Sequence, residues 1–493
     1  MTKKFYVTTP IYYINAAPHI GHAYTTLAAD IITRYKKSKG DCVYFLTGTD
    51  EHGANIEKTA KKEGVTPKEW ADAIVLKYKK LWADLNVNYD DFIRTTDLRH
   101  ERPVQIVFEK LIKSGDIYAG KYKGWYCTPC ENYWDLKDAP DKKCPVHGMD
   151  LEEVEEETYF FKLSKYEKPL LKFYKENPNF LAPKPRTSEI IKFVEGGLRD
   201  ISVSRTKVSW GVTVKSNPEH TIYVWFDALH NYMTAIGLEN ILLGKEDKKF
   251  SDIWPADIHL VGKEIFRFHA VIWPAVLMAL KLPLPKQVFA HGWWTVEGEK
   301  MSKSRGNFIN PSDITSVYGL DSLRYFLFRE VPFGADGDFS IKSFKQRYNA
   351  DLANDFGNLI SRSTNMVIKF AEGKITESDF STDFGLIKKT QEFAKQSDGF
   401  MQTLQFDKAL EKIWAIFSLL NHAIDEHKPW AMVKESPEKV KDFLSQIIIC
   451  LRLSADLIYP FMPQTCEKVK AQLGENPQKQ IIKGESLFPR IEK

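Results

Sequence analysis

The stretch His19-Ile20-Gly21-His22 places two histidines at the beginning of a predicted helix close to the start of the chain. The residues before it, Val7-Thr8-Thr9, are typical of a strand end, and residues 13–18 are typical of a loop. Apolar residues then recur at helical spacing until Gly40 follows a lysine-rich end as a stop signal; they are Ile20, Tyr24, Leu27, Ala28, Ile31 and Tyr35. The sequence therefore predicts a strand, a loop and an amphipathic helix in that order.

The two histidines are suited to an anion. His19 and His22 are three residues apart, so their imidazoles share one face of the first helical turn. Free backbone N–H groups and the helix dipole favour negative charge at that turn. Gly21 has no side chain and leaves room for a nucleotide to lie against the backbone. For His19 alone, ordinary helix capping is the stronger interpretation.

A lysine-rich run, Lys300-Met301-Ser302-Lys303-Ser304, supports the nucleotide interpretation. Two lysines can neutralise the phosphates of a bound nucleotide, much as lysine and Mg²⁺ do in phosphoryl transfers. The serines keep the loop polar, and Gly298 and Gly306 provide hinges on either side. A lysine-rich loop is by default a solvated surface loop, and its charge alone does not show that it binds a nucleotide.

Composition sets broad limits. A chain of 493 residues can form about three or four domains. With 43% hydrophobic and 27% charged residues it is typical of globular proteins, and the net charge of +4 permits a nucleic-acid partner without proving one. No signal-peptide pattern or bilayer-spanning run is visible. Three of the six cysteines stand apart among apolar neighbours, which fits a reduced, cytoplasmic location.

The segments predict a split α/β domain. Strands and helices alternate up to about Gly115, with strands expected at 5–9 and 42–46. A second α/β stretch begins near Ile222, with strands expected at 221–226, 258–262 and 288–291. The economical fold is one doubly wound parallel sheet interrupted by an insertion. Ligands of such sheets bind beyond the carboxyl ends of the strands, where four polar or aromatic residues follow predicted strands: Tyr13, Asp50, Trp225 and Lys263.

A cysteine cluster lies within the insertion. Cys127-x-x-Cys130 and Cys144-x-x-His147 form two chelating pairs joined by a turn-containing loop. Four N and S ligands suit a tetrahedral Zn²⁺ with no vacant position, which indicates a structural ion. Free surface thiols, or a catalytic zinc, are the weaker alternatives.

From about Tyr348 the chain is predicted to be helical throughout. Apolar stripes of helical period recur along it, as at Phe406, Leu410, Ile413 and Phe417, and favour a helix bundle.

Across its whole length the chain resembles the bacterial-type methionyl-tRNA synthetases of class I, on seven motifs in order. These are Pro10-Ile11-Tyr12-Tyr13, 19–22, Gly48-Thr49-Asp50-Glu51-His52-Gly53, the zinc knuckle, Trp225-Phe226-Asp227-Ala228-Leu229, Gly262-Lys263-Glu264-Ile265, and 300–304. The resemblance implies activation of L-methionine with ATP and Mg²⁺ to methionyl-adenylate, and transfer to the 3′ adenosine of initiator and elongator tRNA(Met).

The resemblance also implies a domain division. Residues 1–115 and 222–292 would be the two halves of the catalytic Rossmann domain, and 116–221 the connective insertion with the zinc knuckle. Residues 293–347 would contain the lysine motif and contact the tRNA stem, and 348–493 would bind the anticodon. The insertion looks too short for the large editing domain of the isoleucyl, valyl and leucyl relatives.

The resemblance further implies roles for individual residues. His19, His22, Lys300 and Lys303 would be catalytic, and Gly21 and Ser302 would join them in binding ATP. Asp50 would hold the substrate ammonium, although helix capping is an alternative for it. The implied methionine pocket is Pro10, Ile11, Tyr13, Asp50, Trp225, Ala228, Leu229, Tyr232, Ile265, Phe268, His269 and Trp273.

At the other end, Asn358, Arg362 and Trp430 match the anticodon-reading positions of the family. Asn358 and Arg362 are one helical turn apart, and Trp430 follows Pro429 at a predicted helix break, where it could offer a stacking platform. From local sequence alone, a buried tryptophan is the preferred interpretation of Trp430.

Two other functions remain open at this point. A cysteinyl-tRNA synthetase also uses zinc, but there the metal grips the substrate thiol and an open site is expected. A non-catalytic tRNA-binding relative would not need the intact histidine and lysine motifs. The single ligand set predicts one zinc, and the chain's end soon after its last predicted helices favours a monomer.

Overall fold

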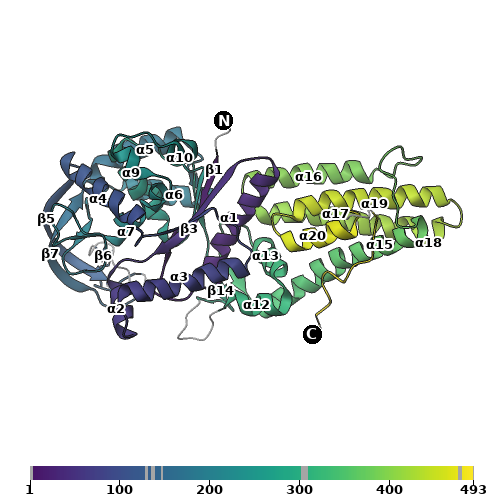
Figure 1. Cartoon of the computed structure of the whole chain (residues 1–493), viewed down its shortest axis with the longest axis horizontal. Coiled ribbons are helices and arrows are strands. Elements are labelled where there is room, and N and C mark those ends of the chain that lie inside the picture. The colour runs from purple at the N-terminus through teal and green to yellow at the C-terminus, as the bar shows by residue number, and fades with distance from the viewer. Residues whose placement is uncertain are drawn as a thin grey trace. The chain divides into compact units, whose positions relative to one another are not determined.

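The computed structural model describes residues 4–127, 132–134, 139–145, 148–300, 309–475 and 480–491 (Figure 1). The chain divides into two compact units. Unit 1 contains Met1–Pro18 and Ala28–His291, and unit 2 contains His19–Leu27 and Gly292–Lys493. Helix α1 (Ile20–Ser38) contributes its first turns to unit 2 and the remainder to unit 1.

Unit 1 is built around a parallel sheet, as predicted. The strand order is β2-β3-β1-β12-β13-β8, and β4 pairs with β3. The two halves of the predicted domain meet at the centre, where Val7 of β1 lies opposite Ile258 of β12. The strands are β1 (Phe5–Thr8), β2 (Tyr12–Tyr13), β3 (Val43–Asp50), β4 (Asp91–Arg94), β8 (Leu181–Ala182), β12 (Ile258–Gly262) and β13 (Val288–His291).

Helices between the strands supply the rest of the α/β core. Amphipathic α3 begins with a capping box, in which Thr66 and Glu69 bond each other's backbone N–H groups. After α1, the helices of unit 1 are α2 (Ala54–Lys62), α3 (Pro67–Asp84), α4 (Leu98–Lys113), α5 (Glu167–Glu176), α6 (Lys184–Glu195), α7 (Val224–Ala228), α8 (Asn231–Thr234), α9 (Leu238–Leu242), α10 (Lys248–Ile253) and α11 (Trp273–Leu280). A π-helical turn (Phe268–Ile272) directly precedes α11.

The strand predicted at 221–226 is wrong beyond Ile222. Only β11 (Thr221–Ile222) forms, and it pairs antiparallel with β10 (Ser204–Arg205) outside the parallel sheet. Helix α7 begins at Val224, immediately afterwards. A short apolar run has no clear period, so a strand and a buried helical turn are hard to distinguish in sequence.

Residues 116–221 contain a second, antiparallel sheet in the order β6-β5-β7-β9. Its strands are β5 (Ile117–Cys127), β6 (Asn132–Trp134), β7 (Glu152–Phe161) and β9 (Ile201–Ser202). The same stretch also supplies β8, which lies at the edge of the parallel sheet beside β13, and the buried residues Phe180, Ile190 and Val194 join the α/β core.

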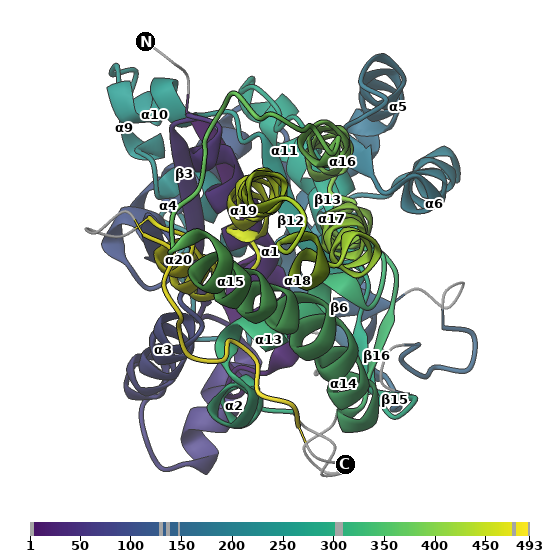
Figure 2. The same cartoon turned by 90° about the vertical axis from the view of Figure 1, so that its right-hand side faces the viewer.

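Unit 2 contains a small sheet and a helix bundle. The sheet is β15-β14-β16, formed by β14 (Trp294–Val296), β15 (Glu299–Lys300) and β16 (Gly337–Phe339). The helical C-terminal region confirms the predicted helix bundle, and Figure 2 shows α16, α17 and α19 of the bundle nearly end-on. Its helices are α12 (Pro311–Tyr318), α13 (Leu320–Arg329), α14 (Ile341–Arg347), a π-helical segment (Tyr348–Gly357), α15 (Asn358–Ala371), α16 (Leu386–Gln402), α17 (Phe406–His427), α18 (Pro429–Met432), α19 (Pro437–Ile458) and α20 (Pro463–Gln472).

Within the part of the chain that the structure describes, every helix is too short or too polar to cross a bilayer.

Candidate functional site

A pocket opens in unit 1 at the carboxyl ends of the central strands. Most of its lining belongs to the predicted methionine set, although these residues are spread over the first 269 positions of the chain. Pro10 and Ile11 follow strand β1, and Asp50 is the last residue of β3. The remaining lining residues lie in or directly beside α7, α8 and the π-helical turn before α11. The lining residues are Pro10, Ile11, Asp50, Trp225, Ala228, Leu229, Asn231, Tyr232 and His269.

Asp50 gives the pocket its negative group. It is the last residue of β3, is 6% exposed, and lies opposite Tyr13 in the parallel β2–β3 pair. The helix that follows is capped by Gly53, so the capping role considered for Asp50 is wrong. A carboxylate in a largely dry pocket is suited to a cationic group of a ligand.

A chain of hydrogen bonds joins Ile265, His269 and Tyr232 at one end of the pocket. The carbonyl of Ile265 can only accept, so His269 donates its Nδ1–H to it over 3.0 Å. Burial lowers the pKa of His269 to about 4, which keeps the ring neutral. Its Nε2 therefore accepts from the hydroxyl of Tyr232 at 2.7 Å. These two hydrogen bonds hold His269 in the tautomer that carries its proton on Nδ1.

Aromatic stacking forms a second wall. The rings of Trp225 and Phe268 are parallel within 12°, with centroids 4.1 Å apart. Both are partly buried. Flat aromatic surface beside an apolar wall suits a thioether, since sulfur–aromatic contacts are each worth about 0.3–1.5 kcal/mol.

Four members of the predicted set lie around the pocket and are not among its lining residues. Tyr13 pairs with Asp50 through the backbone, Ile265 accepts from His269, and Phe268 covers Trp225. Trp273 is fully buried behind Tyr232, with ring centroids 6.0 Å apart. Asn231 was missed, because a polar residue beside an aromatic one carries no signal of its own in the sequence.

The histidine pair lies at the start of α1, in unit 2. The backbone N–H of Gly21 donates to Nδ1 of His19 at 3.0 Å, and that of His19 donates to Nδ1 of His22 at 3.1 Å. The rings are 3.9 Å apart between centroids. Burial, and then the neighbouring His19, lower the pKa of His22 well below its usual value. A neutral ring whose Nδ1 accepts carries its proton on Nε2, so both rings are donors at Nε2.

The beginning of the lysine motif belongs to the same unit. Lys300 ends β15, whose partner strand β14 places the ring of Trp294 against Tyr24 of α1 with centroids 5.6 Å apart. The backbone N–H of Ile20 donates to the carbonyl of Ile309 at 3.4 Å. The segment carrying Ser302 and Lys303 is outside the described residues, as is the side chain of Lys300.

Two of the four predicted zinc ligands are described. Cys127 ends β5, Cys144 lies in the loop before β7, and both are buried in one small cluster with Ala139 and Leu151. Cys130 and His147 lie outside the described residues. Among the residues that are described, none of the acidic, histidine and cysteine side chains group into a complete metal site. The shared burial of two thiols fits half of the predicted ligand set.

The three predicted anticodon residues belong to the bundle of unit 2. Asn358 begins α15 and is exposed, and Arg362 on the next turn donates to Asp425 of α17 at 2.7 Å. Helix α17 ends at His427, and α18 carries Trp430 directly after it. The Trp430 side chain is 46% exposed, so the interpretation of it as a core residue is wrong.

Two family models together match most of the chain. A family model described as tRNA synthetases class I (M) matches residues 5–154 and 135–364. A second, described as the anticodon binding domain of methionyl tRNA ligase, matches residues 376–487.

Individual relatives align with nearly the full length of this chain. The methionine–tRNA ligase of Caldanaerobacter subterraneus subsp. tengcongensis is 48% identical, over 100% of this chain and 80% of the relative. That of Thermotoga maritima is 45% identical, over 99% of this chain and 80% of the relative. A solved structure of Mycobacterium tuberculosis methionyl-tRNA synthetase in complex with methionyl-adenylate superposes with a TM-score of 0.93 at 38% identity, covering 99% of this chain and 100% of that one.

Proposed function

Because this chain belongs to the methionyl-tRNA synthetase family of class I tRNA synthetases, and is therefore a methionine–tRNA ligase, we propose how its residues carry out the two steps. L-Methionine and ATP give methionyl-adenylate and pyrophosphate, and the methionyl group then passes to the 3′ adenosine of initiator or elongator tRNA(Met). The single observation that carries the proposal is the unit 1 pocket, which combines one carboxylate with an apolar and aromatic wall.

In this pocket Asp50 binds the ammonium group of methionine, and the side chain lies among Ile11, Trp225 and Ala228. Tyr232 and His269 close the far end, where the hydroxyl of Tyr232 is paired with Nε2 of His269. Discrimination comes from shape: about 1–3 kcal/mol separates amino acids that differ by one methylene in such a pocket.

The activation step needs no general base. The methionine carboxylate is ionised at neutral pH and attacks the α-phosphate directly, so the protein contributes positioning and charge stabilisation. His19 and His22 donate from Nε2 to phosphate oxygens, and Gly21 admits the nucleotide. Lys300, Ser302 and Lys303 stabilise the leaving pyrophosphate. Mg²⁺ bound with ATP supplies additional neutralising charge.

At the bundle, Trp430 stacks on an anticodon base, and Asn358 and Arg362 bind base edges or phosphates. The exposure of Trp430 supports this role. The ion pair with Asp425 aligns Arg362 with the end of α17, from which α18 follows.

Cys127, Cys130, Cys144 and His147 would hold one structural Zn²⁺, which supplies cross-linking of the insertion and takes no part in the reaction. Fresh, unchelated protein should contain about one zinc per chain, and Cys127→Ser should lower both metal content and melting temperature. Cys42→Ser, which alters an exposed thiol elsewhere in unit 1, is the matched control. Zinc-free protein that melts normally would refute the site.

The decisive experiment for the whole proposal is ATP–pyrophosphate exchange measured with each proteinogenic amino acid in turn. Exchange with methionine alone is expected. Exchange with cysteine alone would support the cysteinyl alternative, and no exchange would support a non-catalytic tRNA-binding protein. The predicted domain boundaries, the cytoplasmic location and the monomeric state stay predictions.

A further inference from the structure

Two of the motifs in unit 1 contain polar residues that the methionine pocket does not use. The first motif, 48–53, contributes Asp50 to the pocket, and the second, 225–229, contributes Trp225, Ala228 and Leu229. The remaining histidine and aspartate, His52 and Asp227, lie 175 positions apart in the chain and contact each other at 2.7 Å.

Asp227 is the centre of a buried cluster. It is 0% exposed, and both of its carboxylate oxygens accept hydrogen bonds from histidines. Its Oδ2 accepts from Nδ1 of His52, and its Oδ1 accepts from Nε2 of His100 at 2.9 Å. The other ring nitrogen of His100 lies 2.9 Å from the hydroxyl of Thr234 on α8. One carboxylate thus joins the segment after β3, helix α4 and helix α7.

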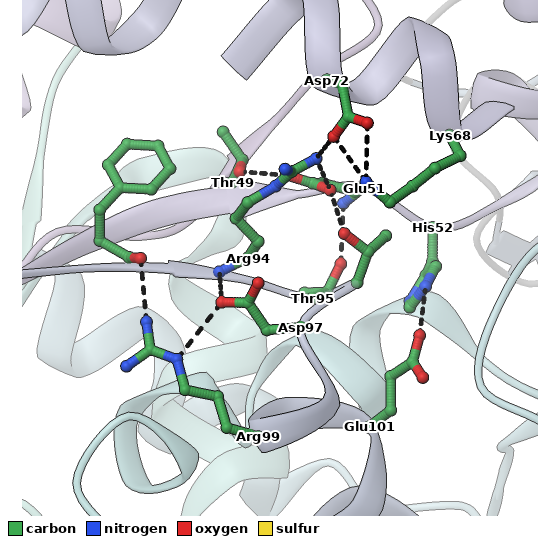
Figure 3. Close-up of polar contacts among 12 residues, drawn as sticks. Thr49, Glu51, His52, Lys68, Asp72, Arg94, Thr95, Asp97, Arg99 and Glu101 are labelled. Carbon is green, nitrogen blue, oxygen red and sulfur yellow. Dashed lines mark hydrogen bonds and ion pairs between the residues drawn. The ribbon is translucent and has the colours of Figure 1, made fainter. Parts of the chain in front are cut away.

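The electrostatics of the cluster favour an ionised pair. Burial opposes charge on Asp227, but His100 and His52 outweigh it and hold the pKa of the carboxyl well below its usual range. Burial also opposes charge on His52, yet the hydrogen bond to Asp227 and the charges of Asp227, Glu101 and Glu51 raise its pKa. Glu101 of α4 faces the outer nitrogen of His52 at 3.8 Å (Figure 3).

The segment after β3 is also held from its other side. Glu51 is fully buried and accepts from Nε and Nη2 of Arg94 at 2.7 and 2.9 Å, and Arg94 in turn pairs with Asp72 (Figure 3). The indole N–H of Trp210 donates to the backbone carbonyl of Glu51 at 2.6 Å. These contacts therefore fix Glu51 and His52, the two residues that directly follow Asp50.

We propose that His52, Asp227 and His100 form a positioning cluster that holds the two walls of the methionine pocket in register. His52 lies two residues after Asp50, and Asp227 lies two residues after Trp225 and next to Ala228. The 2.7 Å contact between them sets the distance between the ammonium-binding carboxylate and the aromatic wall. The inference rests on the proposed function, because it assigns the consequence of this contact to methionine.

The ring nitrogens give a sharp test. An asparagine amide can replace the Nδ1 of histidine as a donor, and a glutamine amide can replace the Nε2. His52 contacts Asp227 through Nδ1, so His52→Asn should keep the pocket and His52→Gln should not. His100 contacts Asp227 through Nε2, so His100→Gln should keep the pocket and His100→Asn should not. The order of tolerance is opposite at the two positions.

The measurement is methionine-dependent pyrophosphate exchange. The non-matching variants should raise KM for methionine about tenfold, the loss of one hydrogen bond to a charged group, with kcat and KM for ATP little changed. Asp116→Asn is the control, since Asp116 is a buried carboxylate of unit 1 bound by Ser114, Lys165 and Tyr166 away from the pocket. It should lower the melting temperature without changing either KM.

Three results would overturn the cluster: equal effects of Asn and Gln at both positions, a parallel rise of both KM values, or the same methionine-specific loss in Asp116→Asn. The double variant His52→Gln/Asp227→Asn adds a further check, because residues acting through one contact must be non-additive. Wild-type exchange is measured first. Its absence would refute the proposed function, and methionine binding by calorimetry would then test the cluster on its own.

Discussion

At the residue scale, the histidine pair shows how local backbone geometry fixes chemistry. The N–H groups of Gly21 and His19 donate to Nδ1 of His19 and His22, so the capping interaction and the phosphate role considered for His19 are compatible. One ring nitrogen completes the helix start, and the other carries the proton. The sequence predicts the histidines and their shared face, but it does not predict the tautomer, because that depends on backbone torsions around residue 19.

The tautomer predicts an asymmetric response at His22. His22→Gln retains an amide donor at the Nε2 position, whereas His22→Asn places its amide at the Nδ1 position. Single-turnover activation should fall by about a hundredfold or more in His22→Asn, the usual loss of one charge-stabilising donor, and clearly less in His22→Gln. Methionine KM should change little in both. A larger loss in His22→Gln would mean that the reacting nitrogen is Nδ1.

Two tryptophans of the bundle differ in exposure and therefore in expected consequence. Trp430 is 46% exposed, whereas Trp414 of α17 is 8% exposed and packs on Tyr325 with centroids 4.3 Å apart. Trp430→Ala should weaken tRNA charging by about 1–3 kcal/mol, the worth of a base–aromatic stack, and leave melting temperature and exchange near normal. Trp414→Ala should cost about 3–5 kcal/mol of stability. Similar melting losses in both variants would contradict the anticodon role of Trp430.

At the element scale, long periodic segments were predictable and short ones were not. Helix α1 combines many apolar repeats with a clear stop signal, and it forms where the sequence predicts it. Helix α7 has only five residues, and its apolar run is equally compatible with a strand. The edge strand β8 has two residues and lies within the predicted insertion, so no periodic signal can reveal it. Of these two short elements, α7 lines the pocket, and its conformation is decided by packing.

Helix α13 illustrates a longer-range role for an element. Arg324, fully buried, donates from Nε and Nη2 to the carbonyls of Phe461 and Pro460 just beyond the end of α19. On the same helix Asp321 accepts the backbone N–H of Thr465 in the first turn of α20. The positive charge of Arg324 lies at the C-terminus of α19, and the negative charge of Asp321 lies at the N-terminus of α20. Both charges therefore interact favourably with the helix dipoles. Helix α13 therefore holds the α19–α20 connection.

Removing the cation should expose the strength of this arrangement. Arg324→Met leaves two buried carbonyls unsatisfied and should cost about 2–5 kcal/mol of unfolding free energy. Arg452→Met is the matched control: Arg452 also donates to a backbone carbonyl, that of Leu473, but its side chain is 23% exposed, so water can replace it at smaller cost. Thermal melting of both variants provides the comparison. Equal losses would show that burial of Arg324 does not determine its contribution.

At the scale of the whole molecule, the pocket unites segments that only the fold brings together. Asp50 comes from the first part of the chain, whereas Trp225 and His269 come after the insertion. The strand pattern alone predicts Asp50 and Trp225 at the ligand-binding edge of the sheet. The other pocket members were proposed only from the resemblance to a family. The His52–Asp227 contact likewise joins two residues that only the fold brings together. Neither of the two motifs that contain His52 and Asp227 indicates in sequence that these side chains meet.

Buried neutral histidines also give the molecule a predictable response to acid. Burial is the main cause that lowers the pKa of four of them: to about 4 in His230 and His269, and well below the usual value in His22 and His259. The unfolded chain protonates such groups below about pH 6.5, while the folded protein does not. Unfolding therefore takes up protons, and stability must fall with falling pH. His52 has the opposite sign, because its raised pKa stabilises the fold at low pH and loses that contribution as pH rises above about 6.5.

The net expectation is a maximum of stability near neutral pH and a steep acid limb. Each of these four histidines with a lowered pKa should reduce the unfolding free energy by about 1.4 kcal/mol per pH unit as the pH falls from 6.5 towards its folded pKa. Asp227 adds no slope there, since the contribution of a carboxyl with a lowered pKa is lost only below about pH 4. Melting temperatures measured across this range should therefore drop faster for the wild type than for His230→Gln, which removes one titrating group. An unchanged acid slope in His230→Gln would mean that this ring takes up its proton in the folded protein as readily as in the unfolded chain.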